Sequence, residues 1–334
     1  MPNVLKVLLG FAVLSVAALV SASAPAQVQE EAFPARPLRF IVPYPPGGPL
    51  DTAARWLSER LAQSLGQAVV VENRSGAGGN IGAAIVAKAR PDGHSLLMGA
   101  VAINAVNPWL YSSLPFDPER DFAPVALVAS VPNVLILNRD FAMTNGIRSV
   151  RDFIDYAEDH PGELNFASGG NGSAGHLAGE LFNVRAGINT LHIPYQGAAP
   201  AKLALLSGEV DFMFDNLASA APLIDQEKVV ALAVSTAERS ALLPGLPTLE
   251  QEGVGKFDIG TWFGVFTTAG TPDAVVSRLN RLVNEALAEP QAREMLRGMG
   301  SDSTPGSPED FSRLVRRDLS RYREIVELSN ARLN

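Results

Sequence analysis

Short apolar runs alternate with longer amphipathic segments in the first part of the chain. The segment 51–65 carries Leu57, Leu61 and Leu65 at a spacing that places them on one helical face. Short apolar strands that alternate with helices predict an α/β fold with a parallel sheet covered on both faces. The predicted elements are a strand at 38–42, a helix at 51–65, a buried strand at 68–73, a helix up to about 90 and a strand at 94–100.

A second alternating region follows an irregular, proline-rich stretch. The apolar segments 125–131 and 134–138, separated by Pro132, predict a strand that crosses between two domains. A strand at 262–267, a long helix at 272–299 and a last helix at 307–329 return to the first domain, so the second domain is inserted into the first. Its predicted strands are 164–168, 210–216 and 229–235, with a strand end and turn at 191–197, and its helices are 149–160, 176–184, 199–206 and 217–226.

The turn 43–51, between the first strand and the first helix, is rich in proline and glycine. Gly48 fits a helix cap, and Pro49 fits the first helical turn, where a missing N–H costs no hydrogen bond. Free N–H groups at such a turn bind anions, although any tight connection between a strand and a helix also needs proline and glycine. Asp51 is expected to stabilise the turn and the helix dipole.

Ligands of α/β sheets bind outside the carboxyl ends of the strands. A second glycine-rich turn, 169–175, links a strand to a helix in the inserted domain as 43–51 does in the first. Residues at such strand ends are therefore candidates for ligand binding, and they include Tyr44, Gly78, Asn80 and Ser168.

Two acids and two aromatic residues allow more than one interpretation. Asp211 and Asp215 share one face of a strand, but only Asp215 lies at the strand end where a ligand binds, so Asp211 is expected to be structural. Trp262 and Phe263 either line a cleft or fill the core, and burial statistics favour the core.

The N-terminus has the pattern of a secretory signal. Lys6 precedes an apolar stretch at 7–20 and a small-residue segment, which predicts a signal peptide at 1–26 with cleavage before Gln27. No later segment has the roughly 20 apolar residues that a membrane span needs. The mature protein is expected to be soluble and periplasmic.

Composition removes several classes of function. The chain has a formal charge of −8 and no basic cluster, which excludes nucleic acid as a partner. An exported chain with no cysteine has no disulfides, so hydrophobic cores must hold it together, and its 334 residues favour two domains.

The sequence contains incomplete motifs for dinucleotide binding, metal binding and nucleophilic catalysis. Gly76 and Gly78 would need a glycine at 81 to form a dinucleotide fingerprint, and Ile81 stands there. The four histidines show no metal-ligand spacing, so we expect no metal and no cofactor. Ser173 lies in a motif like a nucleophile elbow, but no histidine follows His192 to complete the usual triad order.

Six motifs in order resemble the Bug-type receptors, the periplasmic solute-binding components of tripartite tricarboxylate transporters. The resemblance runs from about Arg36 to the C-terminus. It implies a two-lobed periplasmic binding protein fold of the type II-like, venus-flytrap kind, with no catalysis. The motifs lie at 42–51, 73–80, 91–93, 172–176, 192–197 and 261–264 with 270–272.

The family resemblance also implies which residues meet the ligand. Two facing loops hold a carboxylate in the family, and a further loop and an acid line the pocket. The departures are Leu50, where the family has a small polar residue, and His94 with Ser95, where it has an aromatic residue and threonine. The matching positions here are Pro46, Gly47 and Gly48 on the first loop, Gly172, Ser173 and His176 on the facing loop, Tyr195, Gln196 and Gly197, and Asp215.

The implied function is capture of a small carboxylate, such as an amino acid, an aromatic acid or a di- or tricarboxylic acid. The expected partners are this ligand and the membrane permease subunits, and the receptor is expected to be a monomer.

Lobe 1 is predicted to comprise 27–131 and 258–334, and lobe 2 to comprise 132–257, with the two crossings as hinges. An exported serine hydrolase that uses Ser173, or a ligand sensor that presents its closed form to a signalling receptor, are the alternatives.

Overall fold

The structure is a computed structural model that describes residues 33–301 and 305–329, and these residues belong to one compact unit. The predicted signal peptide at 1–26 lies outside the described residues. No helix in the described part of the chain is both long and apolar enough to cross a membrane.

Nine strands form the sheet structure of the described chain. They are β1 (Leu38–Val42), β2 (Val69–Asn73), β3 (Ser95–Ala100), β4 (Phe122–Asn138), β5 (Asn165–Ser168), β6 (Leu191–Pro194), β7 (Phe212–Asn216), β8 (Val229–Val234) and β9 (Gly260–Thr268). Hydrogen bonds connect them in the order β2-β1-β3-β9-β4-β7-β5-β6, and β8 pairs with β4 beside this path.

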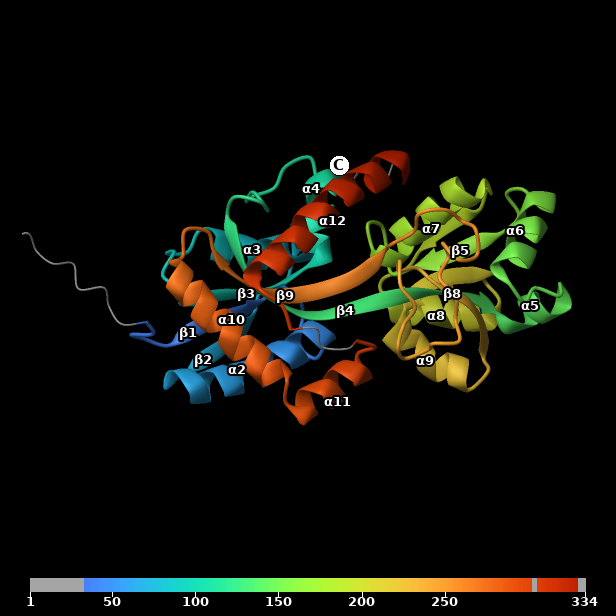
Figure 1. Cartoon of the computed structure of the whole chain (residues 1–334). Helices are drawn as coiled ribbons and strands as arrows, with labels where there is room; N and C mark the ends of the chain where they lie inside the picture. The colour runs from blue at the N-terminus through green and yellow to red at the C-terminus, as the bar shows by residue number, and fades with distance from the viewer. Residues whose placement is uncertain (1–32, 302–304, 330–334) are drawn as a thin grey trace, which may run out of the picture. The chain divides into compact units, whose positions relative to one another are not determined.

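Strand β4 connects the two groups of strands. It pairs with β9 as far as Pro132, which lies opposite Gly260, and from Asn133 onward it pairs with β7 and β8. Figure 1 shows β4 and β9 side by side between the two groups. The predicted crossing strand is therefore confirmed, but it is one continuous strand of 17 residues and not two segments broken at Pro132.

The prediction of a parallel sheet is correct only in part. β1 pairs parallel with β2 and β3, and β5 pairs parallel with β6 and β7, whereas every pair that includes β4 or β9 is antiparallel. The sheet is mixed because the two long strands run in opposite directions between the groups. The strand predicted as buried at 68–73 is β2 at the edge, where the exposed fraction of Val70 is 50%.

Helices cover both groups of strands. The first group carries α2 (Pro49–Leu65), α3 (Asn80–Ala87), α4 (Asn107–Leu110), α10 (Asp273–Leu287), α11 (Pro290–Gly298) and α12 (Pro308–Ser329), with a 3-10 turn η1 (Ala77–Gly79) and a π-helical turn η2 (Ala102–Val106). The second group carries α5 (Arg139–Thr144), α6 (Val150–Asp159), α7 (Ala174–Ala186), α8 (Ala198–Ser207) and α9 (Leu217–Asp225).

Local capping signals place most helix ends as predicted. α2 begins after Gly48 with Pro49 in its first turn and ends at Gly66, whose φ of 67° closes the helix. The single helix predicted at 272–299 is wrong, because the chain turns at Glu289 and Pro290 begins a new helix, α11. Proline lacks the N–H that a continuing helix would need, so it fits the first position of the second helix.

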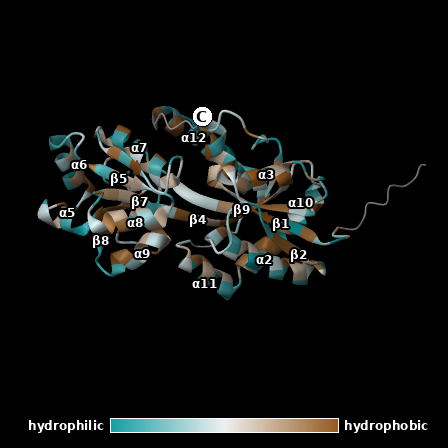
Figure 2. Ribbon diagram, turned by 180° about the vertical axis from the view of Figure 1, so that it is seen from behind, coloured by the Kyte–Doolittle hydropathy of each residue, from teal (hydrophilic) through white to brown (hydrophobic). Residues whose placement is uncertain are grey.

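Three apolar clusters hold the described chain together, and the largest draws on both groups of strands. It includes Phe266 and Phe311 near β9 and α12, and Phe182 and Phe214 near α7 and β7. Trp262 and Phe263 are both buried in the core, and the indole of Trp262 donates to Asp318 at 2.7 Å. In Figure 2 the hydrophobic colour follows the strands, in agreement with these buried side chains.

Candidate functional site

The first glycine-rich loop joins the carboxyl end of β1 to the N-terminus of α2. The buried carboxylate of Asp51 organises this loop. Its Oδ2 accepts from the Gly47 N–H at 2.9 Å and from Arg55 Nε at 3.0 Å, and its Oδ1 accepts from Asn73 Nδ2 at 2.9 Å. Burial opposes the charge, but these donors outweigh it and lower the pKa of Asp51. The expectation that Asp51 stabilises the turn is confirmed.

The same contacts show which N–H groups of the loop remain available. The Gly47 N–H is already bonded to Asp51, and Pro46 and Pro49 have no N–H. Among the described residues, the N–H groups of Gly48 and Leu50 have no hydrogen-bond acceptor. Both belong to the beginning of α2, where the helix dipole favours an anion. The Leu50 side chain packs against the apolar cluster beneath α2.

Tyr44, Gly78 and Asn80 belong to one polar cluster beside this loop. Asn107 Nδ2 donates to Asn80 Oδ1 at 2.8 Å and to the Gly78 carbonyl at 3.2 Å. Burial, followed by the nearby Tyr111, raises the pKa of Tyr44, so its phenol stays neutral. Sequence reasoning missed Asn107 and Tyr111, because nothing in the local pattern brings α4 to the turn at 77–80.

The second glycine-rich loop joins β5 to α7 and is held by its own side chains. The Gly172 N–H donates to His176 Nδ1 at 3.0 Å, and the Gly170 N–H donates to Ser168 Oγ at 3.1 Å. Ser173 caps α7, because its Oγ accepts from the His176 N–H at 3.3 Å. The first two N–H groups of α7, those of Ala174 and Gly175, find no acceptor in the described ranges.

His176 and His192 lie together behind this loop, although they are far apart in sequence. Their rings stack with centroids 4.0 Å apart, and His192 Nε2 lies 2.7 Å from Ser168 Oγ. Burial lowers the pKa of each histidine to about 4, and for His192 the neighbouring His176 lowers it further. Both rings are therefore neutral at pH 7 and act as hydrogen-bonding supports of the loop.

Possible metal-ligand atoms of His176, Glu180 and His192 lie within 4.8 Å of one another, which the scattered histidines of the sequence did not suggest. The hydrogen bonds disfavour a metal. His176 Nδ1 uses its lone pair to accept from Gly172, so its Nε2 carries the proton and faces Glu180 at 3.7 Å. The rings of His176 and His192 are nearly parallel, with an interplanar angle of 21°. Their nitrogen lone pairs therefore do not converge on one point, as the coordination of a metal ion would require.

The third predicted loop, 195–197, lies against the second. The Tyr195 N–H donates to the Ser168 carbonyl at 3.0 Å, and Gly197, with a φ of 108°, caps α8. The Gln196 side chain is exposed. The Tyr195 ring packs against the apolar cluster of α8 and α9, and burial, followed by Glu209, raises the pKa of its phenol. The backbone of Tyr195, more than its hydroxyl, therefore borders the loop.

Asp211 and Asp215 differ as the sequence indicates. Asp211 Oδ2 accepts from the Asn165 N–H at 2.7 Å and connects β7 to β5. Asp215 is 4% exposed, and its Oδ2 has no hydrogen-bond partner among the described residues. Burial raises the pKa of Asp215, while Ser219 and Lys202 oppose that rise. Lys202 Nζ donates to Ser219 Oγ at 2.6 Å, so an ammonium lies near this carboxyl group.

The second loop meets the first group of elements at one point. A Cβ on Gly172 would lie 2.3 Å from Cδ1 of Leu110 in α4, so a larger residue at position 172 would have to displace the Leu110 side chain. The φ of Gly172, +76°, also favours glycine. Loops from the two groups of strands are thus in contact beside the free N–H groups of α7. Leu110 carries no sequence signal that predicts this contact.

The serine hydrolase alternative lacks a base for its nucleophile. Ser173 Oγ caps α7, and the nearest histidine, His176, uses its Nδ1 for Gly172. Ser168 lies beside His192, but its side chain is completely buried, so its hydroxyl is exposed neither to a substrate nor to the ligand that the sequence predicted for it.

Comparisons with known proteins define the family. Residues 53–331 match the model of the tripartite tricarboxylate transporter family receptors, TctC, and the chain belongs to this family of receptors. It is 35% identical over 316 residues to Protein BugT of Bordetella pertussis, covering 94% of this chain and 96% of BugT. The resemblance to the Bug-type receptors is therefore confirmed.

Solved structures agree in fold. The R. palustris protein Rpa4515 with adipate has a TM-score of 0.76 and 36% identity, covering 90% of this chain and 100% of that one. MatC from Rhodopseudomonas palustris with bound malate has a TM-score of 0.73 and 34% identity, covering 88% and 100%. The predicted α/β, two-lobed binding protein fold is confirmed, and the family to which the chain belongs is one of receptors.

The support that His176 gives to the loop predicts a pH-dependent stability. Its pKa lies at about 4 in the folded protein, below its ordinary 6.5, so the unfolded chain binds the proton more readily. The contribution of the neutral histidine to the free energy of unfolding therefore has its full value above pH 6.5. It falls by about 2 to 3 kcal/mol per such histidine as the pH drops to 4. Urea unfolding at several pH values measures this loss.

Two substitutions of His176 distinguish the effect of its hydrogen bond to Gly172 from the effect of its protonation. His176→Asn places an oxygen where Nδ1 stands and should keep the loop while making the pH dependence shallower. His176→Leu leaves the Gly172 N–H without an acceptor and should cost about 1–3 kcal/mol at pH 7. His160→Asn, at the end of α6, is the control. Equal pH profiles for the wild type and His176→Asn would contradict the assignment.

Proposed function

We propose that this chain is a periplasmic solute-binding receptor that captures a small carboxylate between two lobes for a tripartite tricarboxylate transporter. The observation that carries the proposal is the pair of glycine-rich loops at 46–48 and 169–173. Each opens a helix whose first N–H groups are free, and the loops belong to the two groups of strands that β4 joins. Membership in the receptor family and relatives with adipate and malate support it.

The proposed site binds its anion without arginine or lysine. Free N–H groups of Gly48 and Leu50 on α2, and of Ala174 and Gly175 on α7, would each contribute a charge-assisted hydrogen bond of about 1.5–3 kcal/mol. Gly47 and Gly172 shape the loops, because their N–H groups are bonded to Asp51 and His176. The residues predicted from the family motifs, Pro46, Ser173, Tyr195, Gln196, Gly197 and Asp215, surround these amides in our proposal.

The receptor would work by closure. Lobe 1 would comprise 27–131 and 258–334 and lobe 2 132–257, with β4 and the connection before β9 as hinges. A ligand that touches loops of both lobes favours the closed state by its higher affinity for that state. We propose that the chain is exported by a signal peptide at 1–26, acts as a monomer and presents its closed form to the permease subunits.

The contact between Gly172 and Leu110 gives a direct test of closure. Gly172→Val should weaken adipate or malate binding at least tenfold in isothermal titration calorimetry, because its side chain would strike Leu110 when the loops meet. Gly146→Val is the matched control, since Gly146 also has a positive φ, 68°, but has open space around it. Leu110→Ala should restore part of the affinity lost in Gly172→Val. Equal affinities of Gly172→Val and the wild type would contradict closure at this contact.

Asp215 is predicted to decide between classes of carboxylate. If its carboxylate meets the ligand in its ionised form, an amino group is attracted and a further carboxylate is repelled. Glutamate should then bind more tightly than citrate, and Asp215→Asn should reduce this preference about tenfold. Calorimetry of both proteins with glutamate, aspartate, nicotinate and citrate measures it. An unchanged order of affinities would remove Asp215 from the specificity of the site.

A further inference from the structure

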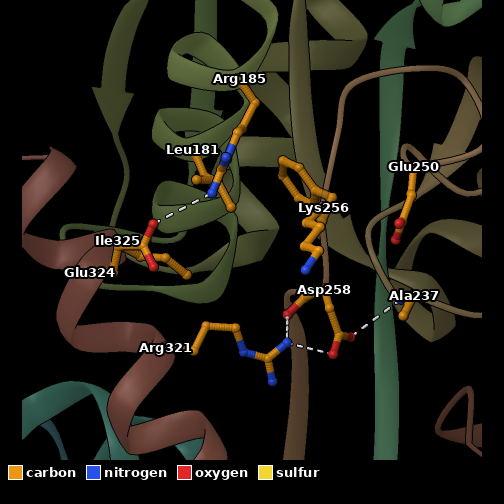
Figure 3. Close-up of a pocket in the computed structure, with 10 residues that line it drawn as sticks. Leu181, Arg185, Ala237, Glu250, Lys256, Asp258, Arg321, Glu324 and Ile325 are labelled. Atoms are coloured by element: carbon orange, nitrogen blue, oxygen red, sulfur yellow. Dashed lines mark hydrogen bonds and ion pairs between the residues drawn. The ribbon is translucent and has the colours of Figure 1, made fainter.

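A cavity of about 350 Å³ lies between α7, α12 and the connection that leads into β9. Its walls on α7 are Leu181 and Arg185, in the second half of the helix. Leu181 lies eight residues after Ser173, or about 12 Å along the helix axis, so the cavity is separate from the glycine-rich loop. Figure 3 shows α12 on the other side, with Arg321, Glu324 and Ile325 turned toward it.

The cavity has an apolar wall and a set of charges that is only partly paired. Leu181, Phe257 and Ile325 supply buried apolar surface. Arg185 Nη2 lies 3.5 Å from Glu324 Oε1, and Arg321 bonds to Asp258. These two pairs connect α7 to α12 and α12 to the connection before β9.

Lys256 is the cation of the wall that has no such partner. Across 33–301 and 305–329, no carboxylate lies within ion-pair distance of Lys256 and no hydrogen bond includes its ammonium. Figure 3 shows this ammonium between the side chains of Arg185 and Arg321. Arg321 Nε is also buried and finds no acceptor in the described part of the chain. The Lys256 ammonium is therefore available to an anion in the cavity, whereas Arg321 adds positive charge to the wall but is paired with Asp258 and Asp318.

We propose that this cavity is a second binding site, for a small organic monocarboxylate with an apolar body. Its volume lies within the roughly 300–1,000 Å³ of ligand pockets. The carboxylate bonds to Lys256 and approaches Arg321, and the apolar body lies on Phe257, Leu181 and Ile325. Wall carboxylates, including Asp258 and Glu324, repel a second negative charge, so di- and tricarboxylates are disfavoured.

Occupancy of this site is coupled to closure of the lobes, a consequence that depends on the proposed function. The cavity exists in the arrangement in which Gly172 meets Leu110, and its walls come from α7 in one group of elements and α12 in the other. A ligand that bridges them stabilises this arrangement. Coupling of this kind is commonly worth about fivefold or more in affinity, and it acts equally in both directions.

The test uses 4-fluorobenzoate as the probe with the full mature chain. Fluorine NMR should show saturable binding in the millimolar range or tighter. Lys256→Gln should weaken it at least tenfold, and Lys256→Arg should retain it. Ala237→Phe should also weaken it, because Ala237 is an exposed residue of the cavity wall and a larger side chain fills the space without removing core packing. Lys228→Gln, an exposed lysine at the beginning of β8, is the matched control and should bind as the wild type does.

The outcomes of these experiments distinguish the proposed cavity site from the proposed carboxylate site between the two glycine-rich loops. Binding that is unchanged by Lys256→Gln overturns the proposal. Competitive displacement of the probe by saturating adipate would assign the probe to the carboxylate site between the two glycine-rich loops instead. An absence of saturable binding at any concentration up to tens of millimolar also overturns it. Adipate affinity with and without saturating probe then measures coupling: a fivefold gain supports the link to closure, and no gain refutes the link while leaving the direct binding result in place.

Discussion

The backbone hydrogen bonds of β4 bind the two halves of this receptor into one molecule. The strand is paired with β9 as far as Pro132 and with β7 and β8 beyond it, so its 17 residues belong to both groups of strands. Ser235 supports the change of partner, because its Oγ lies within hydrogen-bond distance of the carbonyls of Asn133 and Ile259 and its one O–H can donate to either. The parallel strands on either side can then direct their carboxyl ends, and the loops that follow them, toward a common region.

Side chains in the loops at these strand ends accept hydrogen bonds from some of the loop N–H groups and leave other N–H groups without an acceptor among the described residues. A carboxylate, Asp51, shapes the first loop, and a neutral imidazole, His176, shapes the second. Each accepts from a glycine N–H four residues before it, which fixes a turn that is strained for other residues. In the proposed site the anion binds at the helix N-termini, where the donors are already fixed, so that little ordering is needed on binding.

Local rules predicted much of this structure. Gly48 and Pro49 mark the beginning of α2, and the two glycine-rich turns follow the ends of β1 and β5. The antiparallel course of β9 and the contact between Leu110 and Gly172 could not be predicted, since both depend on segments distant in sequence. The stacking of His176 on His192 is of the same kind. The break before α11 is different, because Pro290 supplied a signal and the amphipathic pattern on both sides concealed it.

We propose that the N-termini of α2 and α7, one in each half of the molecule, together hold the carboxylate. Two-dimensional NMR of the ¹⁵N-labelled protein during titration with adipate tests it most directly. The N–H resonances of Gly48, Ala174 and Gly175 should move downfield together and saturate at one affinity, as carboxylate oxygens replace water on these donors. Adipate binding that saturates while these resonances stay in place would contradict the account, and so would a failure of adipate, malate and glutamate to move any of them.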